Sequence, residues 1–373
     1  MLALKCQTVI NLIEQYFPKR LAEEWDSVGL HVGDPATEVT GILAALDVNF
    51  QTVAEAVSKG LNMIVSHHPL IFKPIKHIRN DLAYGRILTE LIKNDISVYC
   101  AHTNMDSAQE GVNQVLADLL GLQNLQVLNP DKIGKLYKLV VYVPQGYQDT
   151  VREAMTRAGA GCIGNYSECT FSVQGTGTFK ASEGSDPFIG QVGVLEKADE
   201  FRMETVIQEE YVQRVVKEMI KAHPYEEVAY DIFKLENPGK IQGLGRMGKL
   251  PQPVEFEELL NNIKRKLNIT TLRYGGKLDM TVQKIAVCGG SGANLMHKAA
   301  FMGADVFLTG DLKYHEAQEI LTLNLGFVDA GHYATEFPVV KKVAGLLRDG
   351  FKKAGYSVPV HVSENNSDSF KYF

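Results

Sequence analysis

The sequence predicts an α/β fold: a mostly parallel sheet flanked by helices, interrupted by an inserted domain. Short apolar runs typical of strands alternate with segments of helical periodicity on both sides of residues 131–240, as in βαβ units. Within 131–240 the order of expected elements changes to β-α-β-β-α-β, the ferredoxin-like arrangement. We therefore expect a discontinuous α/β core, 1–130 and 241–373, and an inserted α+β domain, 131–240.

The first flank shows clear periodicity. Apolar side chains at helical spacing predict helices over 4–17, 50–59, 81–94 and 110–120. Apolar runs predict strands over 42–48, 63–68 and 96–101. The segment 24–30 is expected to be a loop, and its Trp25, the only tryptophan, to be a core or interface anchor.

The insert and the second flank follow the same logic. In the insert we expect strands over 136–143, 168–173, 201–207 and 227–234 and helices over 147–158 and 209–222, with an exit at Asn237-Pro238-Gly239. In the second flank we expect strands over 243–250, 284–288, 306–309, 327–330 and 357–362. Helices are expected over 254–267, after 292 to about 302, and over 333–347.

Composition excludes several classes of protein. The net charge of −6 arises from 38 basic and 44 acidic residues without a long like-charged block, which argues against nucleic acid as a partner but not against a nucleotide-sized ligand. Five scattered cysteines without a C-x-x-C pair argue against a disulfide framework or a zinc knuckle. The chain shows neither a signal-peptide pattern nor an apolar run of membrane-spanning length, so a cytoplasmic location is expected.

Metal-ligand side chains follow three separate apolar strands. His67 and His68 stand at the end of one strand, where Pro69 stops the sheet ladder. Asp106 closes the segment after the next strand, and His332 and Glu336 lie four apart at the start of a helix. Because ligands of open α/β sheets bind at the carboxyl ends of strands, these clusters predict a shared metal site.

The ligand types indicate the metal and the reaction class. Three imidazoles and two carboxylates without a thiolate suit zinc, iron, manganese or nickel better than a calcium cage or a copper–thiolate site. Five ligands are too many for one catalytic ion with an open position, and suit two ions that share a bridging carboxylate. Metal-assisted hydrolysis or hydration is the expected chemistry.

Three further sites keep alternative interpretations. Gly290, Ser291 and Gly292 lie between a strand and a helix and either contact a phosphate through backbone N–H groups or form a simple tight turn. His102 either orients a ligand, acts as an acid or base, or caps a loop. Asp311 either takes part in catalysis or substrate contact, or is an ordinary carboxylate at a helix amino terminus.

A family resemblance rests on these same segments. Trp25-Asp26 through Gly29-Leu30, Ser66-His67-His68-Pro69, His102-Thr103-Asn104-Met105-Asp106, Thr309-Gly310-Asp311, and Gly331-His332 with Glu336 resemble the Nif-three-like dinuclear metal-centre family, also labelled GTP cyclohydrolase 1 type 2 homologues. The resemblance covers both flanks. It implies two divalent metal ions per chain, zinc, iron or manganese, held by His67, His68, Asp106, His332 and a bridging Glu336. It also implies a homo-oligomer, a toroidal hexamer, with the metal pairs facing an internal cavity.

The insert adds a second resemblance, to the PII and CutA-like ferredoxin fold, a type that often trimerises and binds small regulators. Two functions are therefore expected. The first is a dinuclear metal-dependent hydrolase of a nucleotide or related heterocycle, with GTP as the candidate that the family label names. The alternative is a metal-binding regulatory or metal-delivery protein, in which the insert is a sensor or an assembly module.

Overall fold

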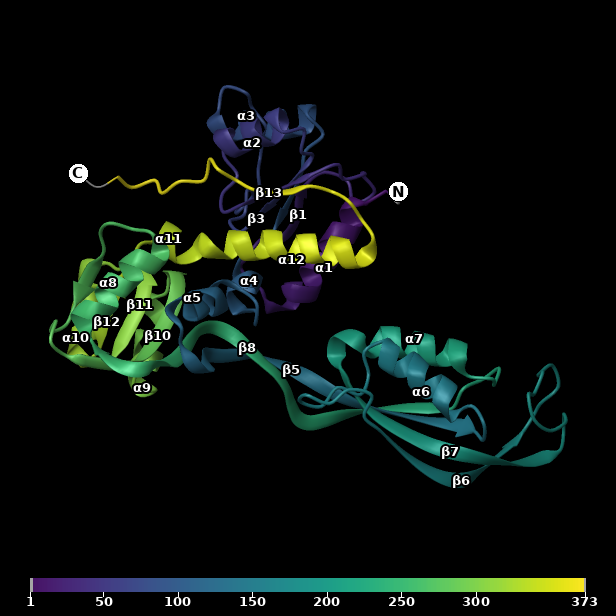
Figure 1. Ribbon diagram of the computed structural model, residues 1–373. Helices are drawn as coiled ribbons and strands as arrows, with labels where there is room; N and C mark the ends of the chain where they lie inside the picture. Colours follow the sequence, from purple (N-terminus) through teal and green to yellow (C-terminus); the bar gives the residue numbers. More distant parts are fainter. Residues whose placement is uncertain (1–2, 372–373) are drawn as a thin grey trace. The chain divides into compact units, whose positions relative to one another are not determined.

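The computed structural model describes residues 3–371, which form two compact units (Figure 1). One unit contains residues up to Lys132 and from Gln242 onward, and the other is Ile133–Ile241. The sequence placed the insert at 131–240. No helix within 3–371 combines the length and the apolar character that crossing a membrane requires.

The first sheet of the larger unit has five strands in the order β1-β4-β3-β2-β13. They are β1 (Gly29–Val32), β2 (Ile42–Ala45), β3 (Met63–Ser66), β4 (Ser97–Cys100) and β13 (Val360–Val362). Strands β13, β2, β3 and β4 are parallel, and β1 pairs antiparallel with β4. All residues of β2, β3 and β4 are buried, as expected for parallel strands covered on both faces.

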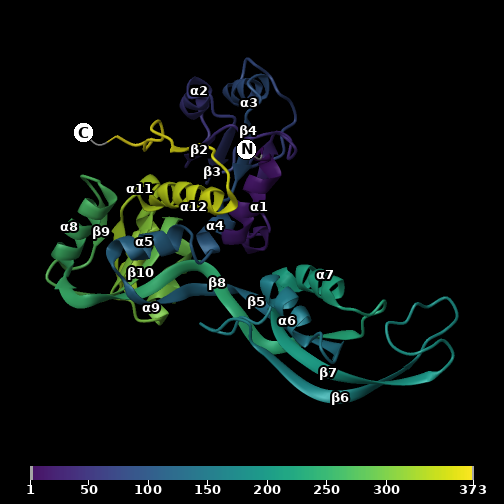
Figure 2. The same cartoon turned by 45° about the vertical axis from the view of Figure 1, so that its right-hand side comes forward.

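Helices cover both faces of this sheet (Figure 2). The helices α1 (Cys6–Tyr16) and α12 (Pro338–Ala354) pack on one face, where their apolar side chains join Ile42, Ala44 and Val65. On the other face, α2 (Phe50–Ser58) and α3 (Ala83–Lys93) pack against Leu43, Ile64 and Val98. The alternation of side chains along each strand therefore feeds two separate cores.

The second sheet of the same unit is built around three parallel strands, β10 (Thr281–Ser291), β11 (Val306–Gly310) and β12 (Gly326–Asp329). Strands β8 (Tyr230–Glu255) and β9 (Arg273–Gly275) flank them in antiparallel pairing. The helices α5 (Val112–Leu120) and α8 (Phe256–Leu267) pack on one face. The helices α9 (Met296–Phe301) and α10 (Tyr314–Thr322) pack on the other.

The smaller unit contains the second part of β5 (Gln123–Pro144), then α6 (Gln148–Arg157), β6 (Thr170–Lys180), β7 (Leu195–Gln208) and α7 (Val212–Ala222), followed by the first part of β8. Its strands lie in the order β6-β7-β5-β8. Leu139, Val141 and Met203 of the sheet form one core with Val151 of α6 and Val215 of α7. The unit therefore has a hydrophobic core of its own.

Several elements differ from the sequence-based expectations. The α/β class is correct, but the larger unit has two mixed sheets rather than one mostly parallel sheet. Strand β5 begins at Gln123, β6 runs through Gly175 and Gly177, and β8 continues through Asn237-Pro238-Gly239, where an exit was expected. The short elements β1, β9 and α4 (Thr103–Ser107) were not predicted, because three to five residues carry too little periodicity.

Trp25 and two of the cysteines differ in exposure. Trp25 is 61% exposed, so it is not a core residue, and its role as an interface anchor stays a prediction. Its ring lies edge-on to Phe72 and His102. Cys100 and Cys288 are buried free thiols.

Candidate metal centre

Three chain segments from the two sheets of the larger unit meet at one cluster. His67 and His68 directly follow β3, and Asp106 lies on α4, which follows β4. His332 and Glu336 lie on α11 (His332–Glu336), which follows β12 in the other sheet. Neighbouring parallel strands end at one edge, which places the first two segments together. The third segment, which contains His332 and Glu336, lies beside them because the two sheets pack together.

The cluster contains three overlapping groups of three side chains. Within each group, the ligand atoms all lie within 4.8 Å of one another. The groups are His67, His68 and His102; His68, His332 and Glu336; and His67, Asp106 and Glu336. The structure therefore brings together all five residues named from the sequence as ligands, and adds His102. His102 is placed beside His67 and His68, with ring centroids 5.3 and 5.7 Å away.

Glu336 joins two of these groups through its two oxygens. Its Oε2 atom lies 2.9 Å from His68 Nε2 and 3.0 Å from His332 Nε2. Its Oε1 atom lies 3.8 Å from His67 Nε2. A carboxylate that presents one oxygen to each of two ligand groups has the geometry of a bridge.

The four histidines are anchored in the same way. The Nδ1 atom of His68 lies 2.8 Å from Asp47 Oδ1, that of His102 lies 2.9 Å from Asp26 Oδ1, and that of His332 lies 2.6 Å from Asp311 Oδ2. His67 Nδ1 lies 3.0 Å from the backbone oxygen of Ala101. Because all four acceptors are oxygens, each Nδ1 donates its proton outward and each Nε2 is left to face the cluster. Metal-binding histidines are typically oriented in this way.

Two buried atoms in the cluster lack a hydrogen bond. His67 Nε2 and Asp106 Oδ1 have no hydrogen-bond partner among residues 3–371. The two atoms lie 3.6 Å apart, which is too far for a hydrogen bond between them. Unpaired buried polar atoms are costly, and both of these atoms are electron-pair donors. His68 Nε2 and His332 Nε2 also face each other at 3.3 Å. This donor set fits a cation.

Proton affinities reflect the crowding of charge. Burial, reinforced by the negative charge of Glu336, raises the pKa of Asp106 to about 7. The hydrogen bond to Glu336 is the main cause that raises the pKa of His332 to about 9. Burial alone would lower the pKa of His68, but the hydrogen bonds that His68 donates to Asp47 and Glu336 outweigh burial and raise that pKa to about 10. The protein alone therefore holds protons where a cation would bind.

The remaining sequence candidates have defined places. Asp311 holds His332 rather than facing the centre of the cluster. The N–H groups of Gly290 and Gly292 donate to the hydroxyls of Thr335 and Thr309, so these two donors are already used within the chain, and the phosphate contact stays a prediction that this arrangement does not favour. Gly290 instead permits close approach: at φ 62°, an added Cβ would lie 2.1 Å from Glu336 Oε1.

Sequence reasoning missed the roles of Asp26 and Asp47. Asp26 belongs to the Trp25-Asp26 pair that supported the family resemblance, but its contact with His102 spans 76 residues. Asp47 lies after β2, which ends at Ala45, but the expected strand 42–48 placed Asp47 inside the strand and so concealed its position at the strand end.

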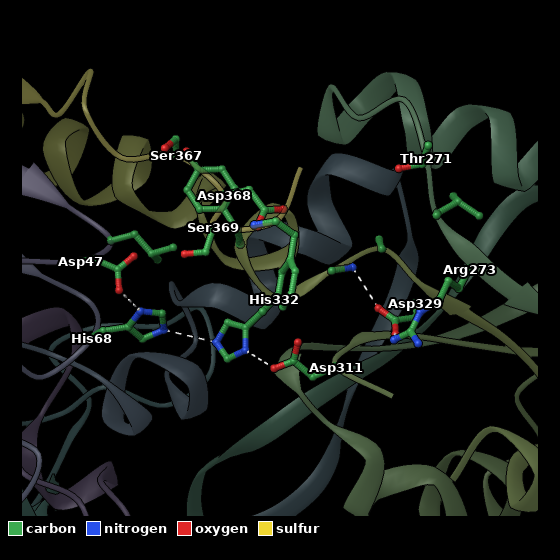
Figure 3. A pocket seen from close by; sticks show the side chains of 16 residues that line it. Asp47, His68, Thr271, Arg273, Asp311, Asp329, His332, Ser367, Asp368 and Ser369 are labelled. Atoms are coloured by element: carbon green, nitrogen blue, oxygen red, sulfur yellow. Dashed lines mark hydrogen bonds and ion pairs between the residues drawn. The ribbon is translucent and has the colours of Figure 1, made fainter. Parts of the chain in front are cut away.

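A pocket of about 780 Å³ adjoins the cluster. Figure 3 shows Asp47, His68, His332 and Asp311 joined in a row along one side. Arg273 and Asp329 lie on the other side, and the segment Ser367–Phe370 lines the pocket between them. The volume is in the range of small-molecule sites.

Comparisons with known proteins identify the family. The family model Duf34/NIF3 (NGG1p interacting factor 3) matches residues 4–369. Proteins named GTP cyclohydrolase 1 type 2 homolog, from Halalkalibacterium halodurans and Bacillus subtilis, are 45% and 43% identical over 369 residues, 98% of each chain. A solved structure of a Bacillus cereus protein related to NIF3 covers 100% of both chains with a TM-score of 0.94 and 43% identity. The family prediction is thus confirmed, and the chain belongs to the Duf34/NIF3 family.

Proposed function

We propose that this chain is a metal-dependent hydrolase with two divalent ions, zinc, iron or manganese, acting on a nucleotide or a related heterocycle. His68, His332 and Glu336 hold one ion, and His67, Asp106 and Glu336 hold the other. The observation that carries the proposal is the pair of buried, unpartnered atoms, His67 Nε2 and Asp106 Oδ1.

When bound, such a pair of ions acidifies a water molecule and stabilises negative charge on a substrate oxygen. The chain's own residues supply the geometry. Glu336 sets the spacing between the two ligand groups, while Asp47 and Asp311 fix the rings of His68 and His332. His102 is held by Asp26 through Nδ1, so its Nε2 atom either completes the ligand set or carries a proton beside it.

The substrate class rests on the relatives' names and on the adjoining pocket. The relatives are named as homologues of a GTP cyclohydrolase, which makes GTP the first substrate to test. The pocket of about 780 Å³ reaches His68 and His332, so a molecule bound in it lies next to the proposed ions.

The test combines metal analysis with turnover. We expect wild-type protein to retain about two equivalents of metal after gel filtration, and a nucleotide panel that includes GTP to give metal-dependent turnover. Glu336→Gln should lose both properties. Glu90→Gln removes a charge from an exposed face of α3 and should keep both. A metal-free wild-type protein, or a metal-loaded protein that turns over no member of the panel, would contradict the hydrolase proposal.

A second candidate function is metal delivery or regulation, with the unit 133–241 as a sensor or an assembly module. Its β-α-β-β-α-β order, its strand order β6-β7-β5-β8 and its separate core support a ferredoxin-like domain of the PII and CutA-like type. Transfer of metal from the loaded chain to an apo-acceptor protein, without substrate turnover, would favour this function over the hydrolase.

We also propose that the chain is a homo-oligomer, a toroidal hexamer. Native mass spectrometry of the full chain gives its mass directly, and a monomer at micromolar concentration would contradict the proposal.

A further inference from the structure

The pocket beside the metal cluster is poor in positive charge. Its lining residues include four aspartates, Asp47, Asp311, Asp329 and Asp368, and a single arginine, Arg273, and all lie in the described part of the chain. Figure 3 shows Asp368 between the His68 side and the Arg273 side of the pocket. Three of these aspartates are already paired: Asp47 with His68, Asp311 with His332, and Asp329 with Arg273. Among the described residues that line the pocket, Asp368 is therefore the carboxylate without a cationic partner.

The charge of Arg273 is already compensated. Its Nη2 atom forms an ion pair with Asp329 and also donates to the backbone oxygen of Leu312 at 2.9 Å. Asp329 is held in turn by the N–H groups of Leu312 and Gly331, each at 3.0 Å. Because this pair is neutral as a unit, Arg273 offers hydrogen-bond donors without the net positive charge that a polyphosphate needs.

Two bound divalent ions do not reverse this balance. They would bring four positive charges, but Asp106 and Glu336 would be among the residues that hold them. Asp26, Asp47 and Asp311 each bond a histidine of the same cluster. Those five carboxylates carry one negative charge more than the four positive charges of two divalent ions. The field in the rest of the pocket is then set by Asp368.

Asp368 is held in place by the chain before it. Asn366 is buried; its Oδ1 atom accepts the N–H of Leu46, and its backbone oxygen accepts the hydroxyl of Tyr333 at 2.8 Å. Two residues later, Asp368 accepts the N–H of Phe370 at 2.9 Å. Phe370 is 70% exposed and lines the same pocket, so an aromatic face lies beside a fixed carboxylate.

From these contacts we propose that the pocket selects an uncharged or singly charged aromatic heterocycle and disfavours a nucleoside triphosphate. The N–H donors of the heterocycle meet the carboxylate of Asp368, and its ring packs against Phe370. A triphosphate meets the uncompensated charge of Asp368 and gains little from Arg273. This inference rests on the proposed function, because it defines the substrate class of the same site.

The test is a pair of calorimetric titrations, with guanosine and with GTP, on manganese-loaded and on metal-free full-length protein. We expect guanosine to bind about tenfold more tightly than GTP, and the difference to shrink between about 50 mM and about 300 mM salt as repulsion is screened. Asp368→Asn should reduce the ratio of the guanosine affinity to the GTP affinity by about threefold to tenfold, because it strengthens the binding of GTP. Asp349→Asn removes the same charge from an exposed site on α12 outside the pocket and should change neither affinity.

Tighter binding of GTP than of guanosine by wild-type protein would overturn the inference, as would an unchanged ratio in Asp368→Asn or the failure of both ligands to bind. The metal-free titration distinguishes a failure of this inference from a failure of the proposed function. Protein that binds no manganese but prefers guanosine contradicts only the metal proposal. Protein that binds manganese but prefers GTP contradicts only the inference about the pocket.

Discussion

His68 Nε2 and Glu336 Oε2 lie 2.9 Å apart, although 268 residues separate them in the chain. One residue follows a strand of the first sheet, and the other lies on the short helix after β12 of the second. The cluster therefore depends on the packing of the two sheets within the larger unit, and any change that shifts α11 relative to β3 changes both ligand groups together.

Asp47→Asn should weaken metal binding by about tenfold to a hundredfold while leaving the fold intact. The carboxylate accepts the Nδ1 proton of His68 at 2.8 Å, and an amide can present its NH₂ group instead and turn the ring. Competition with a fluorescent chelator measures the affinity. Asp95→Asn, on an exposed turn after α3, is the control. Equal affinities in wild type and Asp47→Asn would show that Asp47 does not orient the ligand.

Gly290→Ala should displace Glu336 and abolish metal retention. The added Cβ would lie 2.1 Å from Glu336 Oε1, far inside contact distance. Gly60→Ala provides a closely matched control, because Gly60 has φ 64° against 62° for Gly290, but its Cβ would meet nothing within 4 Å. Both variants carry about 1 kcal/mol of backbone strain. Metal analysis measures the displacement of Glu336, and thermal unfolding measures the backbone strain that both variants share. Full metal retention in Gly290→Ala would contradict the close contact between the added Cβ and Glu336.

Glu55→Gln should destabilise the protein by about 3 kcal/mol at neutral pH. Although burial opposes it, the contacts of Glu55 with Lys59, Asn365 and Ser363 lower its pKa from 4.5 to about 2. A lowered pKa stabilises the folded state above the unfolded-state value, and this contribution is lost as pH falls from about 4.5 to about 2.

Urea unfolding at a series of pH values checks this prediction. The wild-type free energy of unfolding should fall across that window more steeply than that of Glu55→Gln. The exposed control Glu90→Gln should follow the wild type. Parallel curves for wild type and Glu55→Gln would show that Glu55 has the same pKa in both states.

Arg246→Met should destabilise the larger unit by about 3 to 5 kcal/mol. Arg246 is 3% exposed and donates to the backbone oxygens of Gly243, Gly245 and Ala108 at 2.7–2.9 Å. Methionine fills similar space but leaves three buried oxygens without donors. Denaturant unfolding measures the loss, with the exposed Arg265→Met on α8 as the control. A loss below about 1 kcal/mol would mean that water replaces the guanidinium.

Patterns in the amino-acid sequence predict the α/β class, most helices, the central strands and the candidate ligands. Parallel strands buried on both faces are continuous apolar runs, and the polar residues that end them stand out, as at His67 and Asp106. Because apolar runs and the polar residues that end them are local features of the sequence, they can be recognised without knowledge of the fold. Family membership followed from the same short segments.

Three features depend on packing between distant segments: the two sheets of the core, the contacts of Asp26 and Asp47 with histidines, and the pocket that Arg273 and Asp368 both line. Strands such as β9 exist because a neighbouring strand offers hydrogen bonds, not because three residues have a strong preference. Contacts such as that between Leu46 and Asn366 join residues 320 positions apart. Periodicity reports which face of an element is buried, but it carries no information on which distant element covers that face.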